Sequence, residues 1–144
     1  MELQVGVKAL LKNKDHKFLL LRRNLQKYTK ILKSDEWDIP GGRINPGMSL
    51  LNNLKREIKE ETQLELKEPP RVITAQDILR VPGCHVIRIV YLATIEGEPQ
   101  LDPDEAVDYK WLSMEEMLEM DTIDQYLRAA LKILRCSLEN YKSI

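Results

Sequence analysis

Three glutamates, Glu57, Glu60 and Glu61, stand within a charged stretch at residues 55–61 in which Ile58 is the only uncharged residue. At the 100° per residue of an α-helix, these three carboxylates fall on one face. Mg²⁺ prefers oxygen ligands and is usually held by a few carboxylates together with substrate phosphate oxygens. The spacing therefore predicts a helix that binds one or two divalent cations through its glutamates.

A solvated, purely structural charged face is the simplest alternative for such a run. A surface helix is stabilised when glutamate stands four residues before lysine, but here Glu57 stands three and four residues before two other glutamates. Each like-charged pair costs roughly 0.2–0.5 kcal/mol on an exposed helix, and Arg56–Glu60 is the one attractive pair. Helix stability does not explain this pattern, whereas a bound cation does. Mutual repulsion would also raise the carboxylate pKa values, which suits a general base.

The carboxylates need a helix that is fixed in place. Pro46-Gly47 is a turn signal and Ser49 is a suitable N-cap, so we expect a helix over residues 50–63. Asn53 shares the face of the glutamates. Apolar residues on a neighbouring face can dock the helix on a sheet, namely Leu51, Leu54 and Ile58.

The remaining elements follow from short apolar runs and turn signals. Strands are expected at residues 3–11, 17–23, 71–80, 84–95 and 107–112, with an extended piece at 37–42 and a polar loop at 24–36. Ser113 and Glu116 form a capping box for a short helix, and a final amphipathic helix has Asp121 or Thr122 as its cap. This order predicts an α/β fold, with a mixed sheet packed between helices in one domain over residues 1–144.

Bulk composition narrows the classes of function. The chain has 144 residues, 31% of them charged, and a net charge of −1, so no global field attracts nucleic acid or an anionic membrane. We find no signal peptide and no apolar run of membrane-spanning length. Cys84 and Cys136 form no metal motif, and a cytoplasmic protein with reduced thiols is expected. A polyanionic substrate must therefore be held by local cations or by a metal ion.

The glycine pair and the charged stretch together resemble a known signature. Gly42, thirteen further residues and the run from Arg56 to Leu64 are similar to the signature box of the Nudix hydrolases, and Trp37–Gly42 resembles that family's lead-in. The resemblance implies an α/β/α sandwich and a MutT-like enzyme that uses Mg²⁺ or Mn²⁺ to hydrolyse a nucleoside diphosphate linked to another group, X. We favour a (deoxy)nucleoside triphosphate as the substrate, giving monophosphate and pyrophosphate. The alternatives are ADP-ribose, a dinucleoside polyphosphate, or a non-catalytic nucleotide-sensing module, and a homodimer is left open.

The resemblance also implies roles for the residues of the box. Glu60 and Glu61 would be metal ligands, and Glu57 would be either a ligand or the base that activates water. Arg56 would orient the carboxylates. The Gly41-Gly42 pair would let the backbone approach the metal–phosphate site, because glycine has no Cβ.

Two positions depart from the family pattern. The first glutamate of the box is Met48 here, and its second glycine is Gln63. A thioether cannot bind Mg²⁺ through oxygen or accept a strong hydrogen bond from Arg56. We therefore expect a weakened or retuned site in which Asn45 substitutes in part. Gln63 is the milder change, because other residues can end a helix.

Three residues outside the box are further candidates. Glu105, in an acidic loop before a strand, would complete the metal site, the alternative being a solvated loop residue. Arg23 would bind a substrate phosphate, because the guanidinium fork suits phosphate oxygens, unless it only solvates a strand end. Trp37 would either stack on a nucleobase or pack in the core.

Overall fold

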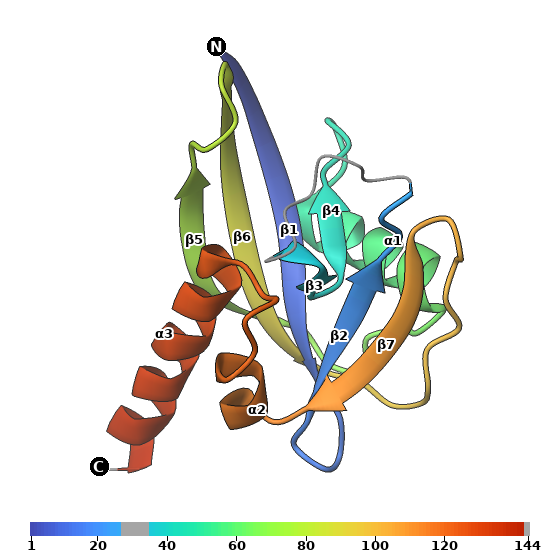
Figure 1. Ribbon diagram of the computed structural model, residues 1–144, viewed down its shortest axis with the longest axis vertical. Helices are drawn as coiled ribbons and strands as arrows, with labels where there is room; N and C mark the ends of the chain where they lie inside the picture. Colours follow the sequence, from blue (N-terminus) through green and yellow to red (C-terminus); the bar gives the residue numbers. More distant parts are fainter. Residues whose placement is uncertain (27–34, 143–144) are drawn as a thin grey trace.

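The strands predicted from the apolar runs join into one mixed sheet with helices on both faces (Figure 1). The computed structural model describes residues 1–26 and 35–142. In chain order, the elements are β1 (Glu2–Lys12), β2 (Phe18–Arg23), β3 (Trp37–Asp38), β4 (Gly41–Arg43), α1 (Leu50–Thr62), β5 (Arg71–Ile78), β6 (Cys84–Thr94), β7 (Ala106–Leu112), α2 (Met114–Leu118) and α3 (Gln125–Lys142).

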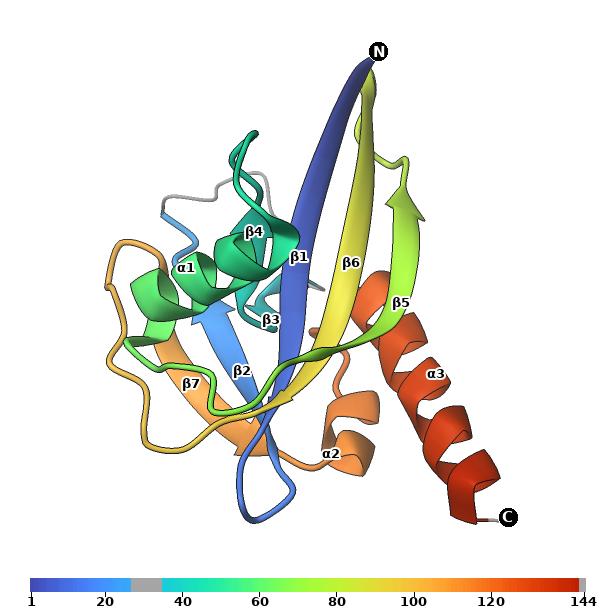
Figure 2. The ribbon, with the colours of Figure 1, turned by 180° about the vertical axis from the view of Figure 1, so that it is seen from behind.

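The central strand β1 has different neighbours along its two sides. It pairs in parallel with β6 over its whole length, and β6 pairs antiparallel with β5. On its other side the last residue of β1 pairs with β2, at Lys12↔Phe18. The earlier residues 6–8 of β1 pair with β4 instead. β2 in turn carries β3 and β7. The sheet therefore forks, with β1 and β4 on one arm and β2, β3 and β7 on the other (Figures 1 and 2).

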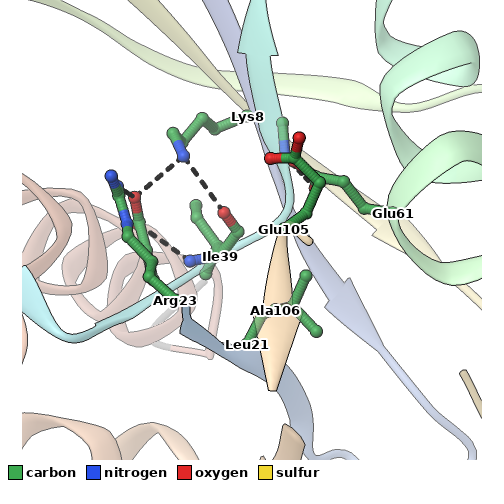
Figure 3. A pocket seen from close by; sticks show the side chains of 9 residues that line it. Lys8, Leu21, Arg23, Ile39, Glu61, Glu105 and Ala106 are labelled. Carbon is green, nitrogen blue, oxygen red and sulfur yellow. Dashed lines mark hydrogen bonds and ion pairs between the residues drawn. The ribbon is translucent and has the colours of Figure 1, made fainter. Parts of the chain in front are cut away.

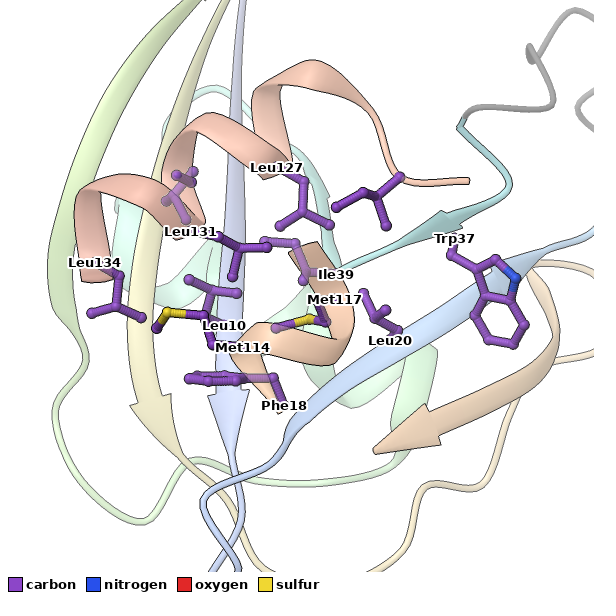
Figure 4. Close-up of a cluster of buried hydrophobic side chains, with 13 residues drawn as sticks. Leu10, Phe18, Leu20, Trp37, Ile39, Met114, Met117, Leu127, Leu131 and Leu134 are labelled. Carbon is purple, nitrogen blue, oxygen red and sulfur yellow. The ribbon is translucent and has the colours of Figure 1, made fainter. Parts of the chain in front are cut away.

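Helices cover both faces of this sheet, as the sequence predicts. α1 lies on one face, where Leu54 and Ile58 are fully buried against side chains of β1 (Figure 2). α2 and α3 lie on the opposite face, over a core whose fully buried members include Leu10, Leu20, Met117, Ala130 and Leu131 (Figure 4). Burial of each of these leucine and methionine side chains stabilises the fold by about 1.5–3 kcal/mol. In the described part of the chain, no helix combines the length and apolar character needed to span a membrane.

α1 begins and ends close to where the sequence predicts. At its start the Ser49 hydroxyl accepts a hydrogen bond from the backbone N–H of Asn52 (3.1 Å). Gln63 ends the helix in the left-handed region with a φ of 62°, which costs a residue with a Cβ about 1–2 kcal/mol. Leu51 does not dock on the sheet as predicted, because Leu54 and Ile58 fill that contact and leave Leu51 38% exposed.

α3 begins later than the sequence predicts. Its capping side chain is Asp124, which accepts a hydrogen bond from the backbone N–H of Leu127 (2.7 Å), so the prediction of Asp121 or Thr122 is wrong. The Thr122 carbonyl instead accepts from the backbone N–H of Trp37 (3.1 Å). This contact with β3 holds the preceding turn outside the helix.

The extended piece predicted at residues 37–42 is two short strands rather than one. β3 ends at Asp38 and β4 begins at Gly41, because Pro40 between them has no N–H to donate to a strand ladder. The polar loop predicted at residues 24–36 lies mostly outside the described residues.

Candidate active site

A small cavity lies in the fork of the sheet, where β1, β2, β3 and α1 meet (Figure 3). Its volume is about 80 Å³. Complete small-molecule sites usually measure about 300–1,000 Å³, so this cavity can hold one polar end of a nucleotide rather than the whole molecule. The residues that line it are Lys8, Leu21, Arg23, Asp38, Ile39, Gly41, Glu61, Glu105 and Ala106.

One side of the cavity is cationic. Lys8 Nζ donates to Asp38 Oδ2 (2.8 Å) and to the Ile39 carbonyl (3.3 Å), and Arg23 Nη2 contacts the same Asp38 oxygen. Burial would raise the pKa of Asp38, but Lys8 and Arg23 outweigh it and hold that pKa well below its usual range. Burial lowers the pKa of Lys8, and Asp38 opposes that effect. Two basic side chains from β1 and β2 thus share one carboxylate.

The opposite side of the cavity carries Glu61 from α1 (Figure 3). Its Oε2 accepts a hydrogen bond from the Gly41 N–H (3.0 Å). Burial raises the pKa of Glu61 to about 7, and the charge of Lys8 and the Gly41 hydrogen bond limit the rise. Burial also raises the pKa of Glu57. The predicted direction of these shifts is confirmed, but burial, rather than crowding of like charges, is the larger cause.

The glycine pair is where β4 comes closest to its neighbours. A Cβ on Gly41, whose φ is 141°, would lie 2.1 Å from the Val7 carbonyl oxygen. A Cβ on Gly42 would lie 2.8 Å from Glu57 Oε2. Gly41 is therefore required by the pairing of β4 with β1, whereas Gly42 leaves space that a carboxylate of α1 uses.

The three glutamates of the box do not converge. The Glu57 side chain is 14% exposed and lies against β4, whereas the Glu60 side chain is 60% exposed and accepts from Arg56 Nη1 (3.2 Å). In residues 1–26 and 35–142, no group of three or more Asp, Glu, His or Cys side chains is placed to hold a metal ion. Glu57 and Glu61 nevertheless both place carboxylate oxygens against the glycine pair, Glu57 at Gly42 and Glu61 at Gly41, and oxygen donors suit a hard cation such as Mg²⁺.

Arg56 links Glu57 and Glu60. Its Nη1 lies 3.0 Å from Glu57 Oε1 as well as 3.2 Å from Glu60 Oε2, and its Nη2 donates to the Arg43 carbonyl (3.2 Å). Its Nε is buried and has no hydrogen-bond partner among the described residues. Leaving such a donor unpaired costs about 1–3 kcal/mol, and the Met48 thioether is only a weak acceptor.

Glu105 and Trp37, the other two predicted site residues, have different surroundings. Glu105 lines the same cavity as Glu61. Trp37 is 7% exposed and belongs to the core between the sheet and α3, with Lys110 Nζ 4.6 Å from the centre of its ring. This position favours the core alternative for Trp37, and its stacking on a nucleobase stays a prediction.

Two charged residues of the cavity, Lys8 and Asp38, were not predicted from the sequence. Lys8 stands among the buried residues Val7 and Ala9 of β1, and Asp38 stands next to the buried Trp37 in β3. Their side chains are only 12% and 6% exposed. Charged residues are almost never this buried without a partner, so an ionic side chain in a buried strand was the available signal. Nothing local indicates that the two would meet, since they lie 30 positions apart.

Comparison with known proteins decides the family. A family model described as the NUDIX domain matches residues 2–131. The chain belongs to the Nudix family. As a Nudix pyrophosphohydrolase it joins enzymes that act on nucleotide substrates and generally use divalent metal ions.

Solved structures support the same Nudix assignment. The MutT protein of Methanosarcina mazei Go1 is 32% identical, with a TM-score of 0.81 over 96% of each chain. The MutT NUDIX hydrolase of Burkholderia pseudomallei is 26% identical, with a TM-score of 0.74 over 92% of this chain and 98% of that one. A UDP-X diphosphatase, 20% identical with a TM-score of 0.69 over 95% of this chain and 65% of that one, shares the fold. No curated protein matches the chain.

Proposed function

We propose that this Nudix pyrophosphohydrolase uses Mg²⁺ or Mn²⁺ to hydrolyse the pyrophosphate bond of a nucleoside diphosphate linked to another group, X. The observation that carries the proposal is the cavity in the fork, which has Lys8 and Arg23 on one side and Glu61 on the other. Cations suit phosphate oxygens, and carboxylates suit a metal ion. A pyrophosphate bound between them would have its charge balanced on both sides.

The residues that would hold the metal ion are Glu57 and Glu61, joined by Glu60 and Glu105. Glu60 reaches the ion only if its side chain leaves Arg56, whose Nη1 it contacts at 3.2 Å. When bound, the ion supplies a Lewis acid that neutralises phosphate charge and lowers the pKa of water.

The chain's own groups would divide the remaining work. Arg23 and Lys8 would hold phosphate oxygens, and Asp38 would keep both cations oriented toward the cavity. Water forms a bond to phosphorus, the bridging P–O bond breaks, and the water proton goes to a carboxylate. Glu61 is one candidate for this base, because burial raises the pKa of its carboxyl, but it can serve only when other carboxylates hold the ion. Glu57 is the other candidate.

The preferred substrate is a (deoxy)nucleoside triphosphate, cleaved to monophosphate and pyrophosphate. A cavity of about 80 Å³ takes phosphate groups and leaves the nucleoside outside it. ADP-ribose, dinucleoside polyphosphates and nucleoside diphosphate sugars present the same phosphates and belong in the test. The last class is included because one structure of the same fold is a UDP-X diphosphatase.

The test is a panel assay of phosphate and pyrophosphate release from these nucleotides with Mg²⁺ or Mn²⁺, with EDTA as the control. We expect metal-dependent turnover of at least one nucleotide and nearly none in Glu57→Gln. Nucleotide binding without turnover on the whole panel would contradict the proposal. It would favour a nucleotide-sensing module instead, a reading that the unpaired Nε of Arg56 also supports.

A further inference from the structure

Asn53 is a polar residue with no exposed surface in the first turn of α1. Its side-chain amide is fully used. Nδ2 donates to the carbonyls of Met48 (2.9 Å) and Ser49 (2.8 Å), and Oδ1 accepts from Asn45 N (2.7 Å) and from Arg56 Nη2 (3.2 Å). Because two carbonyls require the NH₂ group, the amide cannot be flipped. Its oxygen therefore has to face Arg56.

This oxygen shares Nη2 of the Arg56 guanidinium with the Arg43 carbonyl, each at 3.2 Å. Arg56 Nε is buried without a partner among the described residues, and the box position at which the family carries a glutamate is Met48. Asn53 touches both the main chain of Met48 and the Arg56 side chain. The main chain of Met48 is therefore close enough to Arg56 for a single side-chain amide to contact both.

We propose that Asn53 is a positioning residue that replaces the carboxylate missing at position 48. It holds Arg56, and Arg56 in turn holds Glu57 (3.0 Å) and Glu60 (3.2 Å) beside the place of the metal ion. The expected substitute, Asn45, contributes only its backbone N–H, which fixes the Asn53 oxygen rather than Arg56 itself. The inference rests on the proposed function, because it concerns the same metal site.

The alternative is that Asn53 only stabilises the turn before α1 through its hydrogen bonds to the Met48 and Ser49 carbonyls. A rescue experiment separates the two roles, because a glutamate at position 48 could replace the contact with Arg56 but not the hydrogen bonds to the Met48 and Ser49 carbonyls. The primary measurement is Mn²⁺ affinity of the otherwise metal-free protein, by titration calorimetry and by the electron paramagnetic resonance signal of free Mn²⁺. kcat and KM on a substrate from the panel follow as a second measurement.

We expect Asn53→Ala to weaken Mn²⁺ binding about 10–100-fold, as changes behind metal ligands commonly do, and to lower kcat more than it raises KM. The double variant Met48→Glu/Asn53→Ala should recover most of the Mn²⁺ affinity, whereas Met48→Leu/Asn53→Ala should not. Met48→Glu alone should tighten Mn²⁺ binding by giving Arg56 Nε an acceptor. Asn52→Ala is the matched control, being an exposed neighbour on the same helix that should bind Mn²⁺ like the wild type.

Thermal unfolding without metal monitors the structural role. If Asn53→Ala does not fold, Asn53→Asp, which keeps an acceptor toward Arg56, is compared with Met48→Glu, and both should retain Mn²⁺ affinity. Wild-type affinity in folded Asn53→Ala, or a loss that Met48→Glu does not repair, would overturn the inference. If the wild type binds Mn²⁺ but hydrolyses nothing, the proposed catalysis fails while the affinity series still decides the role of Asn53.

Discussion

Glu61 is a carboxylate held where its charge is disfavoured. Burial raises its pKa to about 7, although the Gly41 N–H and the charge of Lys8 both favour the ionised form. Groups placed for function often lower stability in this way. Its folded pKa lies above the ordinary 4.5, so ionisation of Glu61 costs stability as pH rises from about 4.5 through about 7, and that cost is absent at lower pH.

Replacing Glu61 by glutamine should separate stability from activity. We expect Glu61→Gln to stabilise the metal-free protein at pH 8 by up to about 3 kcal/mol, since one pKa unit corresponds to about 1.4 kcal/mol. The gain should shrink as pH falls toward 4.5, and turnover should drop roughly 10²-fold or more. Urea unfolding at both pH values and the nucleotide assay measure these effects. Exposed Glu60→Gln should barely change stability, and a Glu61→Gln protein that is less stable at pH 8 would contradict the argument.

At the scale of elements, the fork places β4 between β1 and α1. The two glycines of β4 contact different neighbours, Gly41 the backbone of β1 and Gly42 the Glu57 side chain of α1. Gly41→Ala would drive a Cβ into the backbone of Val7, at 2.1 Å, where nothing can move away. Gly42→Ala would press only on the end of the Glu57 side chain. Adjacent glycines should therefore respond differently to the same substitution.

We expect Gly41→Ala to lose more than about 3 kcal/mol of stability or not to fold, which marks a large mutational effect. Gly42→Ala should stay within about 1 kcal/mol of the wild type, because a side-chain end can shift, but should bind Mn²⁺ more weakly as Glu57 moves. Urea unfolding and Mn²⁺ titration of the two variants provide the comparison. Equal losses of stability would show that Glu57 is not free to move.

Asp38 joins three strands, because its carboxylate on β3 contacts Lys8 of β1 and Arg23 of β2. Its folded pKa lies well below the ordinary value of 3.8, so the stability it contributes is present above about pH 4 and is lost as pH falls below that. Asp38→Asn should cost about 3–5 kcal/mol at pH 7, since it leaves two partly buried cations uncompensated. The variant should also lose less stability than the wild type between pH 5 and pH 2.

Unfolding by urea across this pH range tests the role of Asp38. Glu65→Gln is the control, because Glu65 pairs with Lys59 at 3.4 Å on the surface, where both side chains are more than half exposed. Such pairs contribute about 0–1 kcal/mol. A pH profile of Asp38→Asn parallel to that of the wild type would mean that another carboxylate controls acid unfolding.

At the scale of the whole molecule, a metal ion bound in the fork would connect both arms of the sheet with α1. A ligand that binds only the folded state raises stability by about 2.7 kcal/mol at 100 times its Kd. Protons compete with the ion for Glu61, whose pKa is about 7. Mn²⁺ should therefore raise the melting temperature more at pH 8 than at pH 6. Thermal unfolding with and without metal measures this, and a shift that is equal at both pH values would contradict it.

Much of the fold could be read from local pattern. Periodicity and turn residues, which act over a few positions, predict the start of α1 after Ser49 and its buried Leu54 and Ile58. They also predict the order of strands and helices along the chain. The cap of α3 could not be predicted in this way, because the Thr122 carbonyl accepts a hydrogen bond from the N–H of Trp37, which lies on a strand distant in sequence. The sequence predicted Asp121 or Thr122 as the cap, and the helix begins after Asp124 instead.

The candidate site divides in the same way. The sequence by itself determined the helix with crowded carboxylates and the glycine pair before it, because both depend on spacing along the chain. Only the tertiary structure decided that Lys8 and Asp38 join the cavity, that Glu60 turns outward and that Asn53 supports Arg56. Those contacts depend on the register of the strands and on which polar side chains are buried and so need a partner within the protein. Neither can be predicted from the local sequence pattern.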